Sequence, residues 1–450
     1  MQRVSDRVAY AAIMTIGAAC IVAFLLIRLP RAVQTDSSLI SMDGPGYYSY
    51  LRSLVFDGDL DFRNEYRHFE LAVDGTTSTG LVGNPWSVGP ALLWAPFYLM
   101  AHALSLIART LGVQASVDGY GYAYQSAISI ATILYVTAGC LLIYRVCRRY
   151  FSPYSSLLAV VGIYLASSLE HYTVASAAMS HGVSFFAVSL FLFLWHPPRS
   201  RSQREWIVLG LAAGLMTLVR WQDVLYLSMV AVEGIQAIRA AGRGKRAASL
   251  QEYVEGGVIV VLAGAVVFLP QMFAWNELYG TPITMPQGGG FFDWLHPQLL
   301  GYLFSTTPGL FTRHPVILLA TFGLVPLWRR DRKLTVALLI PLLMQCYLNS
   351  AIAEGFAHHE YAFGARRFIS ATPLLALGLA AIAESVTDKF RHGSLAVLAV
   401  ATTFVGWNLL LELQFSLGFV SYGEPLTWNE LFLGKFRMIA ELIGHVIDLP

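Results

Sequence analysis

Apolar residues are grouped along this chain into long runs that recur between Val8 and Leu411. Many of the runs approach the roughly 20 residues with which a helix crosses a hydrocarbon core about 30 Å thick. The pattern therefore predicts an all-α, polytopic membrane protein with about 11 transmembrane helices and with juxtamembrane helices on the outer side. The predicted spans are 8–29, 122–144, 154–169, 181–196, 206–219, 224–238, 254–275, 315–328, 334–352, 369–385 and 394–411.

A further apolar stretch, 88–111, is also long enough to cross a membrane. If it crossed, the basic loop with Arg145, Arg148 and Arg149 would lie outside, and every later basic loop would be inverted. Because Lys and Arg are enriched in cytoplasmic loops, we expect 88–111 to lie on, or re-enter, the outer surface. The N-terminus is then inner and the C-terminus outer. The predicted domains are a transmembrane domain over 1–412, with an outer loop 31–121, and an outer amphipathic tail over 413–450.

The composition supports a membrane protein. Hydrophobic residues make up 56% of the 450 residues and charged residues 13%, whereas soluble chains carry about 25% charged residues. Three of the four cysteines lie inside apolar runs, so we expect neither a disulfide nor a cysteine metal site. These features exclude a soluble enzyme, a secreted disulfide-rich protein and a nucleic-acid-binding protein.

The first outer loop contains an acid, Asp43, directly before a short amphipathic segment. Apolar side chains at helical spacing predict that this segment lies in the membrane interface. Asp43 is then either an N-cap of the helix or a carboxylate held at the membrane surface as a catalytic base. The apolar face consists of Tyr47, Tyr48, Leu51, Leu54 and Val55.

The sequence contains no complete motif of a known metal site. The acidic run 57–61 begins like a calcium loop, but Phe62 and His68 stand where that loop needs Gly and Glu. A looser divalent site at Asp57 and Asp59, or a solvated acidic turn, remains open. His358-His359-Glu360 does not have the spacing of a zinc site.

Other titratable residues gather in the predicted outer loops, and several are cations. Arg313 and the pair Arg366 and Arg367 stand where inward-running spans begin, so free helix N–H groups accompany them. The planar guanidinium matches phosphate oxygens, which predicts a phosphate site; the alternative is that these arginines reach lipid headgroups. The outer candidates are Glu170, His181, Arg220, Asp223, Arg313, Arg366 and Arg367.

This layout resembles the GT-C superfamily of membrane glycosyltransferases, and in particular the protein O-mannosyltransferases and the lipid A aminoarabinose transferases. The shared features are an inner N-terminus, one span, and a long outer loop with an acid before a juxtamembrane helix. The strings at 57–62, 83–86 (Gly-Asn-Pro-Trp) and 304–310 are also similar to an uncharacterised bacterial branch of that superfamily. Where the family has a second acid, this chain has Ser180 and His181.

The resemblance implies a fold, an activity and a site. Asp43 would be the general base of an inverting transfer from a polyprenyl-phosphate-linked sugar to a glycan, lipid or protein acceptor. The site would face the periplasm of a bacterial inner membrane, with membrane lipid as a partner and no cofactor, although a divalent ion remains possible. Arg366 and Arg367 would hold the leaving phosphate, assisted by Arg220, Arg313 or His181. Glu170 or Asp223 could substitute for the second acid, and Tyr47 could stack on the sugar or belong to the interfacial aromatic belt.

Three other functions remain open at this point. A transporter or flippase for a lipid-linked glycan would place charges near the bilayer midplane and show internal repeats, and neither is visible in the sequence. A structural or assembly subunit of an envelope complex would not need an acid and several arginines on one face. A ligase that uses a diphosphate-linked glycan cannot be distinguished from an enzyme with a monophosphate donor.

Overall fold

The computed structural model describes residues 4–72, 75–196, 201–241, 250–307, 309–353, 362–421 and 426–447. Within these residues the chain is helical, with an isolated antiparallel bridge between Phe292 and Ile352. The first half contains α1 (Asp6–Ala23), η1 (Phe24–Arg28), α2 (Leu29–Gln34), α3 (Gly44–Arg52), η2 (Ser53–Asp57), α4 (Arg63–His68), α5 (Gly89–Thr110), α6 (Tyr122–Cys147), α7 (Pro153–Leu165), α8 (His171–Val174), α9 (Ser180–Trp195) and α10 (Gln203–Val219). The second half contains η3 (Trp221–Leu227), α11 (Ser228–Ala241), α12 (Leu250–Tyr279), α13 (Leu299–Phe304), α14 (Leu310–Arg313), α15 (Pro315–Phe322), α16 (Leu324–Arg330), α17 (Arg332–Ser350), η4 (Arg366–Ala371), α19 (Thr372–Lys389), α20 (Gly393–Ser416) and α21 (Trp428–Ile447).

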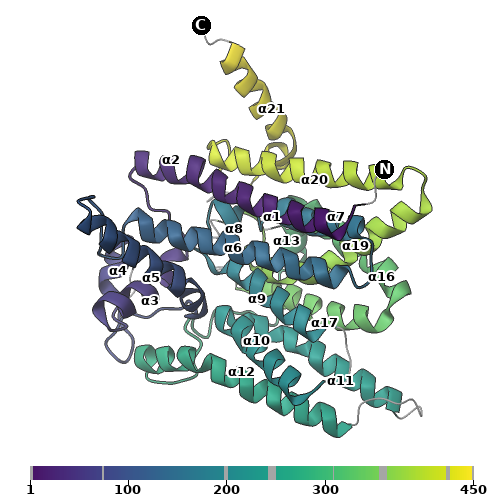
Figure 1. The fold of residues 1–450 in the computed structure, drawn as a ribbon, viewed down its shortest axis with the longest axis horizontal. Coiled ribbons are helices and arrows are strands. Elements are labelled where there is room, and N and C mark those ends of the chain that lie inside the picture. Colours follow the sequence, from purple (N-terminus) through teal and green to yellow (C-terminus); the bar gives the residue numbers. More distant parts are fainter. Residues whose placement is uncertain are drawn as a thin grey trace.

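The long helices run side by side as one bundle (Figure 1). Among the described residues, seven helices are long and apolar enough to cross a membrane, and α7 and α9 are shorter apolar helices. The predicted fold class, an all-α polytopic membrane protein, is confirmed. Each predicted span coincides with a helix or with a pair of consecutive helices, while the number of eleven crossings stays a prediction.

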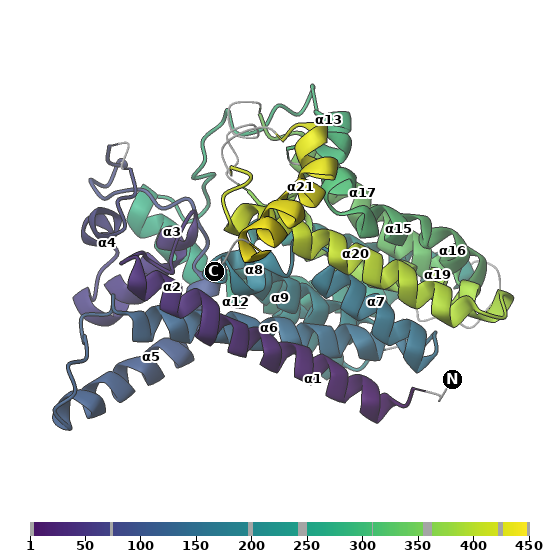
Figure 2. The ribbon, with the colours of Figure 1, turned by 90° about the horizontal axis from the view of Figure 1, so that it is seen from above.

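The bundle has two chemically different ends. The predicted inner loops meet at one of them, where Arg148 pairs with Asp6 at 2.6 Å and Ser152 donates a hydrogen bond to Glu384. The Asp43 loop, α3 and α4 lie at the opposite end, which we call the site end (Figures 1 and 2). The separation of the basic loops from the Asp43 loop is therefore as the sequence predicts.

The ambiguous stretch 88–111 forms α5, which lies against part of one span. Trp94 donates to Thr132 at 3.0 Å, and His102 meets the Tyr124 hydroxyl at 2.7 Å. These contacts make α5 antiparallel to the first half of α6, and α5 then continues past the beginning of α6 at the site end (Figure 2). α5 is itself one of the seven helices that are long and apolar enough to cross a membrane, so its placement at the outer surface stays a prediction.

Small residues allow two of the spans to pack closely. A Cβ atom on Gly214 of α10 would lie 2.6 Å from the carbonyl oxygen of Gly264 in α12. Small residues at such crossings are typical of helix packing in membranes, where backbone approach replaces the hydrophobic effect.

The amphipathic segment after Asp43 differs from the prediction. Tyr47, Tyr48 and Leu51 are buried in the protein, and only Leu54 and Val55 are exposed. The reason is that α5 and its approach cover this face: Tyr48 packs edge-on to Tyr98 of α5 with ring centroids 5.7 Å apart. The helix is part of the core of the site end and not a helix that floats in the interface.

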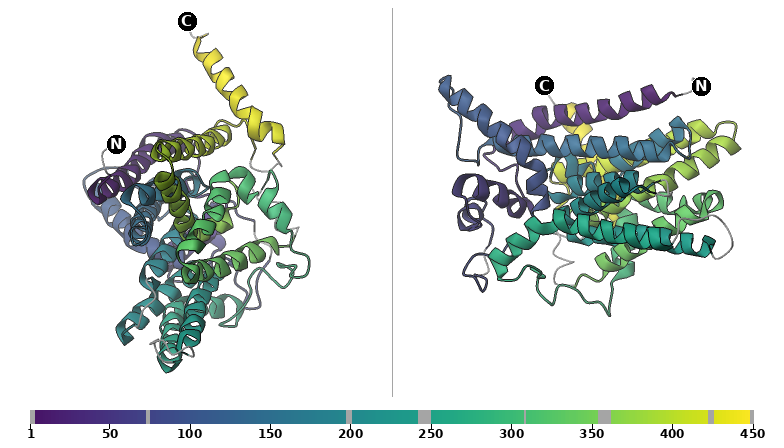
Figure 3. Two further views of the ribbon diagram at one scale, coloured as in Figure 1. Left: turned by 90° about the vertical axis from the view of Figure 1, so that its right-hand side faces the viewer. Right: turned by 60° about the horizontal axis from the view of Figure 1, so that its bottom comes forward.

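The tail contains an amphipathic helix, α21, that projects away from the bundle (Figures 1 and 3). It is attached near its start, where Gln414 donates to the Glu430 carbonyl at 3.0 Å and the Lys435 ammonium lies 4.1 Å from the Trp407 ring centroid. Burial lowers the pKa of Lys435 to about 7. Phe432 packs against Trp407 with ring centroids 5.0 Å apart, while Phe436 is exposed. Because α20 continues to Ser416, the tail begins after that helix.

Candidate active site

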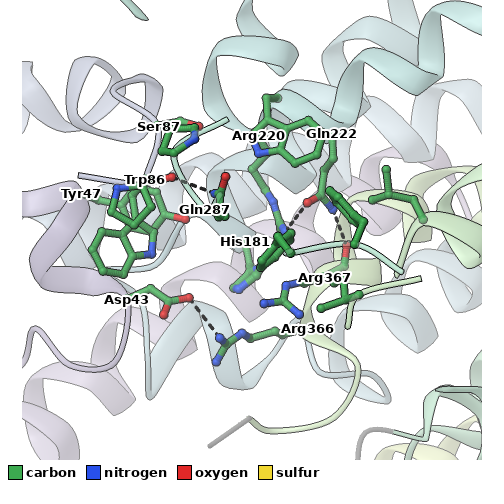
Figure 4. Close-up of a pocket in the computed structure, with 17 residues that line it drawn as sticks. Asp43, Tyr47, Trp86, Ser87, His181, Arg220, Gln222, Gln287, Arg366 and Arg367 are labelled. Atoms are coloured by element: carbon green, nitrogen blue, oxygen red, sulfur yellow. Dashed lines mark hydrogen bonds and ion pairs between the residues drawn. The ribbon is translucent and has the colours of Figure 1, made fainter. Parts of the chain in front are cut away.

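A cavity of about 330 Å³ opens at the site end, between helix ends and two loops (Figure 4). Its floor is made by the starts of α3, α9, η3 and η4, and its roof by residues 85–87 and 286–292. It brings together six of the predicted site residues, which come from distant parts of the chain. The lining residues are Asp43, Tyr47, Pro85, Trp86, Ser87, His181, Arg220, Trp221, Gln222, Pro286, Gln287, Phe291, Phe292, Leu348, Ile352, Arg366 and Arg367.

Asp43 occupies the N-cap position of α3, but its side chain does not cap the helix. Its carboxylate instead accepts a hydrogen bond from Nη2 of Arg366 at 3.1 Å (Figure 4). The Asp43 side chain is 29% exposed and that of Arg366 is 8% exposed. Met42, the preceding residue, has a φ of 58°, a left-handed conformation that bulky residues rarely adopt. Asp43 thus faces the cavity and pairs with Arg366 instead of capping the helix.

The string Gly83-Asn84-Pro85-Trp86 fixes the wall beside Asp43. Asn84 donates to the Gly46 carbonyl at 2.8 Å and accepts from the Trp86 N–H at 3.1 Å. The Trp86 ring then lies directly on Gly46, where an added Cβ would be 1.9 Å from a ring carbon. Only glycine at position 46 leaves room for this tryptophan. The role of Asn84 was not predicted, because a buried amide carries no charge or periodicity signal.

Gly46→Ala should therefore damage the site. The new methyl group overlaps the Trp86 ring, and such overpacking in a filled core costs about 1–3 kcal/mol. We expect a lower midpoint of thermal unfolding and a changed tryptophan emission spectrum. Gly257→Ala in α12 is the matched control, because a Cβ there meets nothing within 4 Å. Equal behaviour of the two variants would contradict the assigned contact.

His181, Arg220 and Gln222 form one hydrogen-bonded group. A guanidinium N–H of Arg220 donates to Nδ1 of His181, so the proton of the neutral imidazole is placed on Nε2. Nε2 is buried and has no hydrogen-bond partner among the described residues. Gln222 accepts from Arg220 at 3.0 Å. His181 thus carries a buried N–H group whose position is fixed by Arg220.

Arg366 and Arg367 complete a positive surface on the floor of the cavity. Both precede α19, so their position at the start of an apolar helix is as predicted. The Arg367 guanidinium lies 5.9 Å from the Phe291 ring centroid in the roof. Together with Arg220 and His181 they surround a space suited to a phosphate (Figure 4). Tyr47 lines the same cavity, and its hydroxyl accepts from Ser180 at 2.8 Å.

The two candidate second acids lie elsewhere. Asp223 is fully buried, accepts from Ser184 at 2.6 Å, and does not line the cavity. Burial raises its pKa to about 6. Glu170 lines a second cavity, and burial together with the neighbouring Glu412 raises its pKa. Among the described residues that line the first cavity, Asp43 is the only carboxylate.

The second cavity, of about 1080 Å³, adjoins the first and shares Asp43, Arg366 and Arg367 with it. It lies between the α1–α2 segment, the turn after α8 and the end of α20. The Asp43–Arg366 pair therefore stands at the junction of two spaces, so a group in either one can reach the carboxylate.

Arg313 is not near this junction, although its place at the start of a span resembles that of Arg366. It is buried and donates to the Thr306 carbonyl at 2.8 Å and the Ala362 carbonyl at 3.2 Å. Burial lowers its pKa to about 10. It lines neither cavity, so Arg313 holds two segments together instead of facing a substrate.

Arg313→Ala should consequently destabilise the fold. The change leaves two carbonyl groups without their donor and opens a void, which together cost about 2–4 kcal/mol. We expect a lower midpoint of thermal unfolding, and an unchanged KM for the donor in the fraction that folds. A raised KM without loss of stability would return Arg313 to the substrate site.

The acidic run 57–61 is bound by protein groups. Asp57 pairs with Arg52 and accepts from Asn64 at 2.6 Å, and Asp59 accepts from Ser53 at 2.8 Å. Within the described ranges no three His, Cys, Asp or Glu residues are grouped so that they could hold a metal ion. Residues 358–360 lie outside the described residues.

The fold was compared with known proteins. No family model matches the chain, and no curated protein matches it with significance. The archaeal oligosaccharyltransferase AglB from Archaeoglobus fulgidus, in complex with an inhibitory peptide and a dolichol-phosphate, is similar in structure with a TM-score of 0.52 and 12% identity; the match covers 90% of this chain and 54% of that one. The apo form of the A. fulgidus oligosaccharyltransferase gives a TM-score of 0.51 and 14% identity over 90% and 54% of the two chains. ArnT from Cupriavidus metallidurans bound to undecaprenyl phosphate gives 0.48 and 15% over 90% and 64%.

The chain thus spans about half the length of the oligosaccharyltransferases that it matches. At these identities the similarity concerns the fold, and it extends over nearly all of this chain. The resemblance seen in the sequence is confirmed at the level of the fold, which this chain shares with these oligosaccharyltransferases.

Proposed function

We propose that this protein is an inverting glycosyltransferase that moves a sugar from a polyprenyl-phosphate carrier to an acceptor hydroxyl on the outer face of the membrane. The observation that carries the proposal is the Asp43 carboxylate at the junction of two cavities, 3.1 Å from Arg366 and beside a cluster of cationic side chains. Glycosyl transfer from a sugar phosphate needs a base for the acceptor proton and cationic groups that stabilise the leaving phosphate, and both lie side by side here.

The reaction follows from these positions. The acceptor oxygen attacks the anomeric carbon of the sugar while Asp43 takes its proton, and the bond from that carbon to the phosphate oxygen breaks. The carrier phosphate leaves with the electron pair of that bond. Arg366, Arg367 and the Nε2–H of His181 stabilise the charge that accumulates on the leaving phosphate.

An apolar groove of about 440 Å³ supports a lipid carrier. It lies between α13, α14, α16, α17 and α19 and includes Phe368, the neighbour of Arg367. Cys346, Tyr347 and Ser350 of the groove lie on α17, which also carries Leu348 of the first cavity. A prenyl chain in this groove would deliver its phosphate to the arginines. The related AglB structure contains a dolichol-phosphate, which is a carrier of this class.

The second cavity is the proposed place of the acceptor, because it reaches Asp43 from the other side of the Asp43–Arg366 pair.

Basic loops at the end opposite the site favour an outward-facing site, because Lys and Arg are enriched in cytoplasmic loops. A bacterial inner membrane with the site toward the periplasm is the location that we propose.

The test is turnover of defined donors by the purified protein. Polyprenyl phosphates that carry single hexoses or pentoses would be incubated with the protein and with membrane lipid extract, and release of the carrier phosphate would be measured. We expect release from at least one donor, no effect of EDTA, and loss of release in Asp43→Asn. A folded protein that neither binds nor cleaves any donor of this class would overturn the proposal; cleavage of diphosphate-linked donors alone would replace it with the ligase function.

A further inference from the structure

The C-terminal helix α21 begins at a defined residue and runs across the direction of the spans. The Thr427 hydroxyl accepts a hydrogen bond from the Glu430 N–H at 3.2 Å, and the Glu430 carboxylate accepts from the Thr427 N–H at 2.7 Å, which is a capping box. Helix α20 lies along the bundle, whereas α21 lies across it and leaves it (Figures 1 and 3). Since the long helices of the bundle are the ones that cross the membrane, α21 extends along a membrane surface.

Three kinds of side chain follow separate faces of α21. Leu431, Lys435 and Met438 are buried, and their spacing of four and three residues places them on one face. A second face, which we call the apolar stripe, consists of the exposed side chains Trp428, Phe432, Phe436 and Ile443. A third face, the charged stripe, consists of the exposed side chains Glu430, Arg437 and Glu441.

Contacts with α20 determine how these faces are turned. The Phe432 and Trp407 ring centroids are 5.0 Å apart. Gln414 donates to the Glu430 carbonyl at 3.0 Å and lies 3.0 Å from the position of a Cβ on Gly434. Trp407 precedes Gln414 by seven residues, which is about 10 Å along a helix that ends beside the second cavity. The apolar stripe is therefore turned toward the middle of the membrane, and the charged stripe is turned away from it.

The apolar stripe continues the lipid-facing surface of α20. Of the candidate spans, α20 has the smallest buried share, 11%, and Leu409 and Leu413 near its end are exposed. From Trp407 of this helix, aromatic rings lead onto α21, because Phe432 also stacks on Trp428 with centroids 5.9 Å apart. Apolar side chains that are exposed in one row gain free energy when acyl chains cover them. The lipid that surrounds α20 is thus in place to cover the apolar stripe as well.

The charged stripe gives no preference for anionic lipid. It carries two carboxylates and one guanidinium, so its formal charge is one negative charge. Basic side chains are what attract a helix to anionic headgroups. The contact of α21 with lipid therefore depends on burial of the apolar stripe, and not on the charge of the headgroups.

We propose that α21 is an interfacial helix of the site end whose partner is the lipid bilayer itself. Its apolar stripe lies among the acyl chains just below the headgroups, and its charged stripe faces the water. Helices of this kind insert their apolar face about 5–10 Å below the headgroups. The inference does not depend on the proposed function, because it uses no residue of either cavity.

The first experiment measures the depth of two nitroxide labels in the full-length protein, with its four native cysteines replaced by alanine, in phosphatidylcholine nanodiscs. Phe436→Cys carries the label on the apolar stripe and Glu441→Cys, the matched control, carries it on the charged stripe. Collisions with oxygen, which concentrates among acyl chains, are compared with collisions with a water-soluble nickel chelate. We expect the oxygen-to-nickel ratio to be at least about threefold higher at position 436, with the same result when phosphatidylglycerol is added.

Three results of this measurement would overturn the proposal. Water-like ratios at both positions would show a helix that stands free in solution. Protection of both labels from both reagents would show that a second copy or another protein covers the helix. A high ratio at position 436 that appears only with phosphatidylglycerol would show that headgroup charge, and not the apolar stripe, holds the helix.

The second experiment tests whether the apolar stripe is the cause of insertion. A label at Ile443→Cys reports the depth, and glutamate is introduced at one of two neighbouring positions. Phe436→Glu places a charge in the apolar stripe and should lower the oxygen-to-nickel ratio at position 443 by about threefold or more. Arg437→Glu, the matched control, adds the same side chain to the charged stripe and should leave the ratio unchanged. An equal effect of the two variants would overturn the assignment of the lipid contact to the apolar stripe.

Discussion

Asp43→Asn is expected to lower the rate of sugar transfer by about 10²- to 10⁴-fold, the usual contribution of a positioned general base. Asparagine has the shape of aspartate and can still accept a hydrogen bond from Arg366, but it cannot take the proton of the acceptor hydroxyl. The loss should therefore appear in kcat, with little change in the KM for the donor.

The fold should survive this change. The Asp43 side chain is 29% exposed, and asparagine keeps the oxygen that accepts the hydrogen bond from the buried Arg366. Asp36→Asn is the matched control, because Asp36 is an exposed carboxylate of the same loop whose left-handed φ of 49° also suits asparagine. Full activity of Asp43→Asn in a folded protein would assign the base to another residue, with Glu170 of the second cavity as the first to test.

The spans could be predicted from the sequence because a membrane helix is specified by its own composition. The length of an apolar run and the position of basic loops do not depend on which helices are neighbours, so α6, α12 and α20 begin and end close to the predicted residues. What covers an apolar face is different. The apolar face after Asp43 has the same pattern whether lipid or α5 covers it, and only the structure shows that α5 does.

The titratable residues of the site could be predicted from the sequence. Asp43, His181, Arg220, Arg366 and Arg367 are titratable groups in predicted outer loops, and the structure brings all five to one cavity. Arg313 had the same signal as Arg366 but points into the protein, because the carbonyl groups of two neighbouring segments are available to it there.

Neutral polar residues could not be predicted. Asn84, Gln222 and Gln287 have no periodicity or charge that marks them, and their functions depend on contacts with residues far away in the chain. Asn84 acts on Gly46, and Gln222 contacts the Arg367 carbonyl at 3.4 Å. A sequence therefore indicates which charges a site contains, and the structure indicates what orients them.

Arg366→Gln is expected to lower kcat for transfer by about 10²- to 10³-fold, the loss that follows when a preorganised charge-stabilising donor is removed. The phosphodiester of the donor carries one negative charge, and a second negative charge develops on the leaving oxygen as the glycosidic bond breaks. A guanidinium contact thus strengthens toward the transition state, so its loss acts mainly on kcat rather than on KM.

Arg366→Lys should recover only part of the rate, since an ammonium lacks the planar fork of arginine. Gly257→Ala, far from the cavity, serves as the control for expression and folding.

The pairing of Asp43 with Arg366 makes a further result of this variant informative. In the free protein the carboxylate occupies one Nη of Arg366, so the phosphate and the carboxylate share a single guanidinium when the donor binds. If both groups act in the same transition state, the double variant Asp43→Asn/Arg366→Gln will be hardly slower than the slower single variant, because each loss already disables the same step. If the loss of rate in the double variant is instead the product of the two single losses, the two residues contribute independently. Arg366 would then bind a phosphate that Asp43 does not influence. The cycle is measured on carrier-phosphate release with one donor, and it separates a shared catalytic pair from two neighbouring side chains.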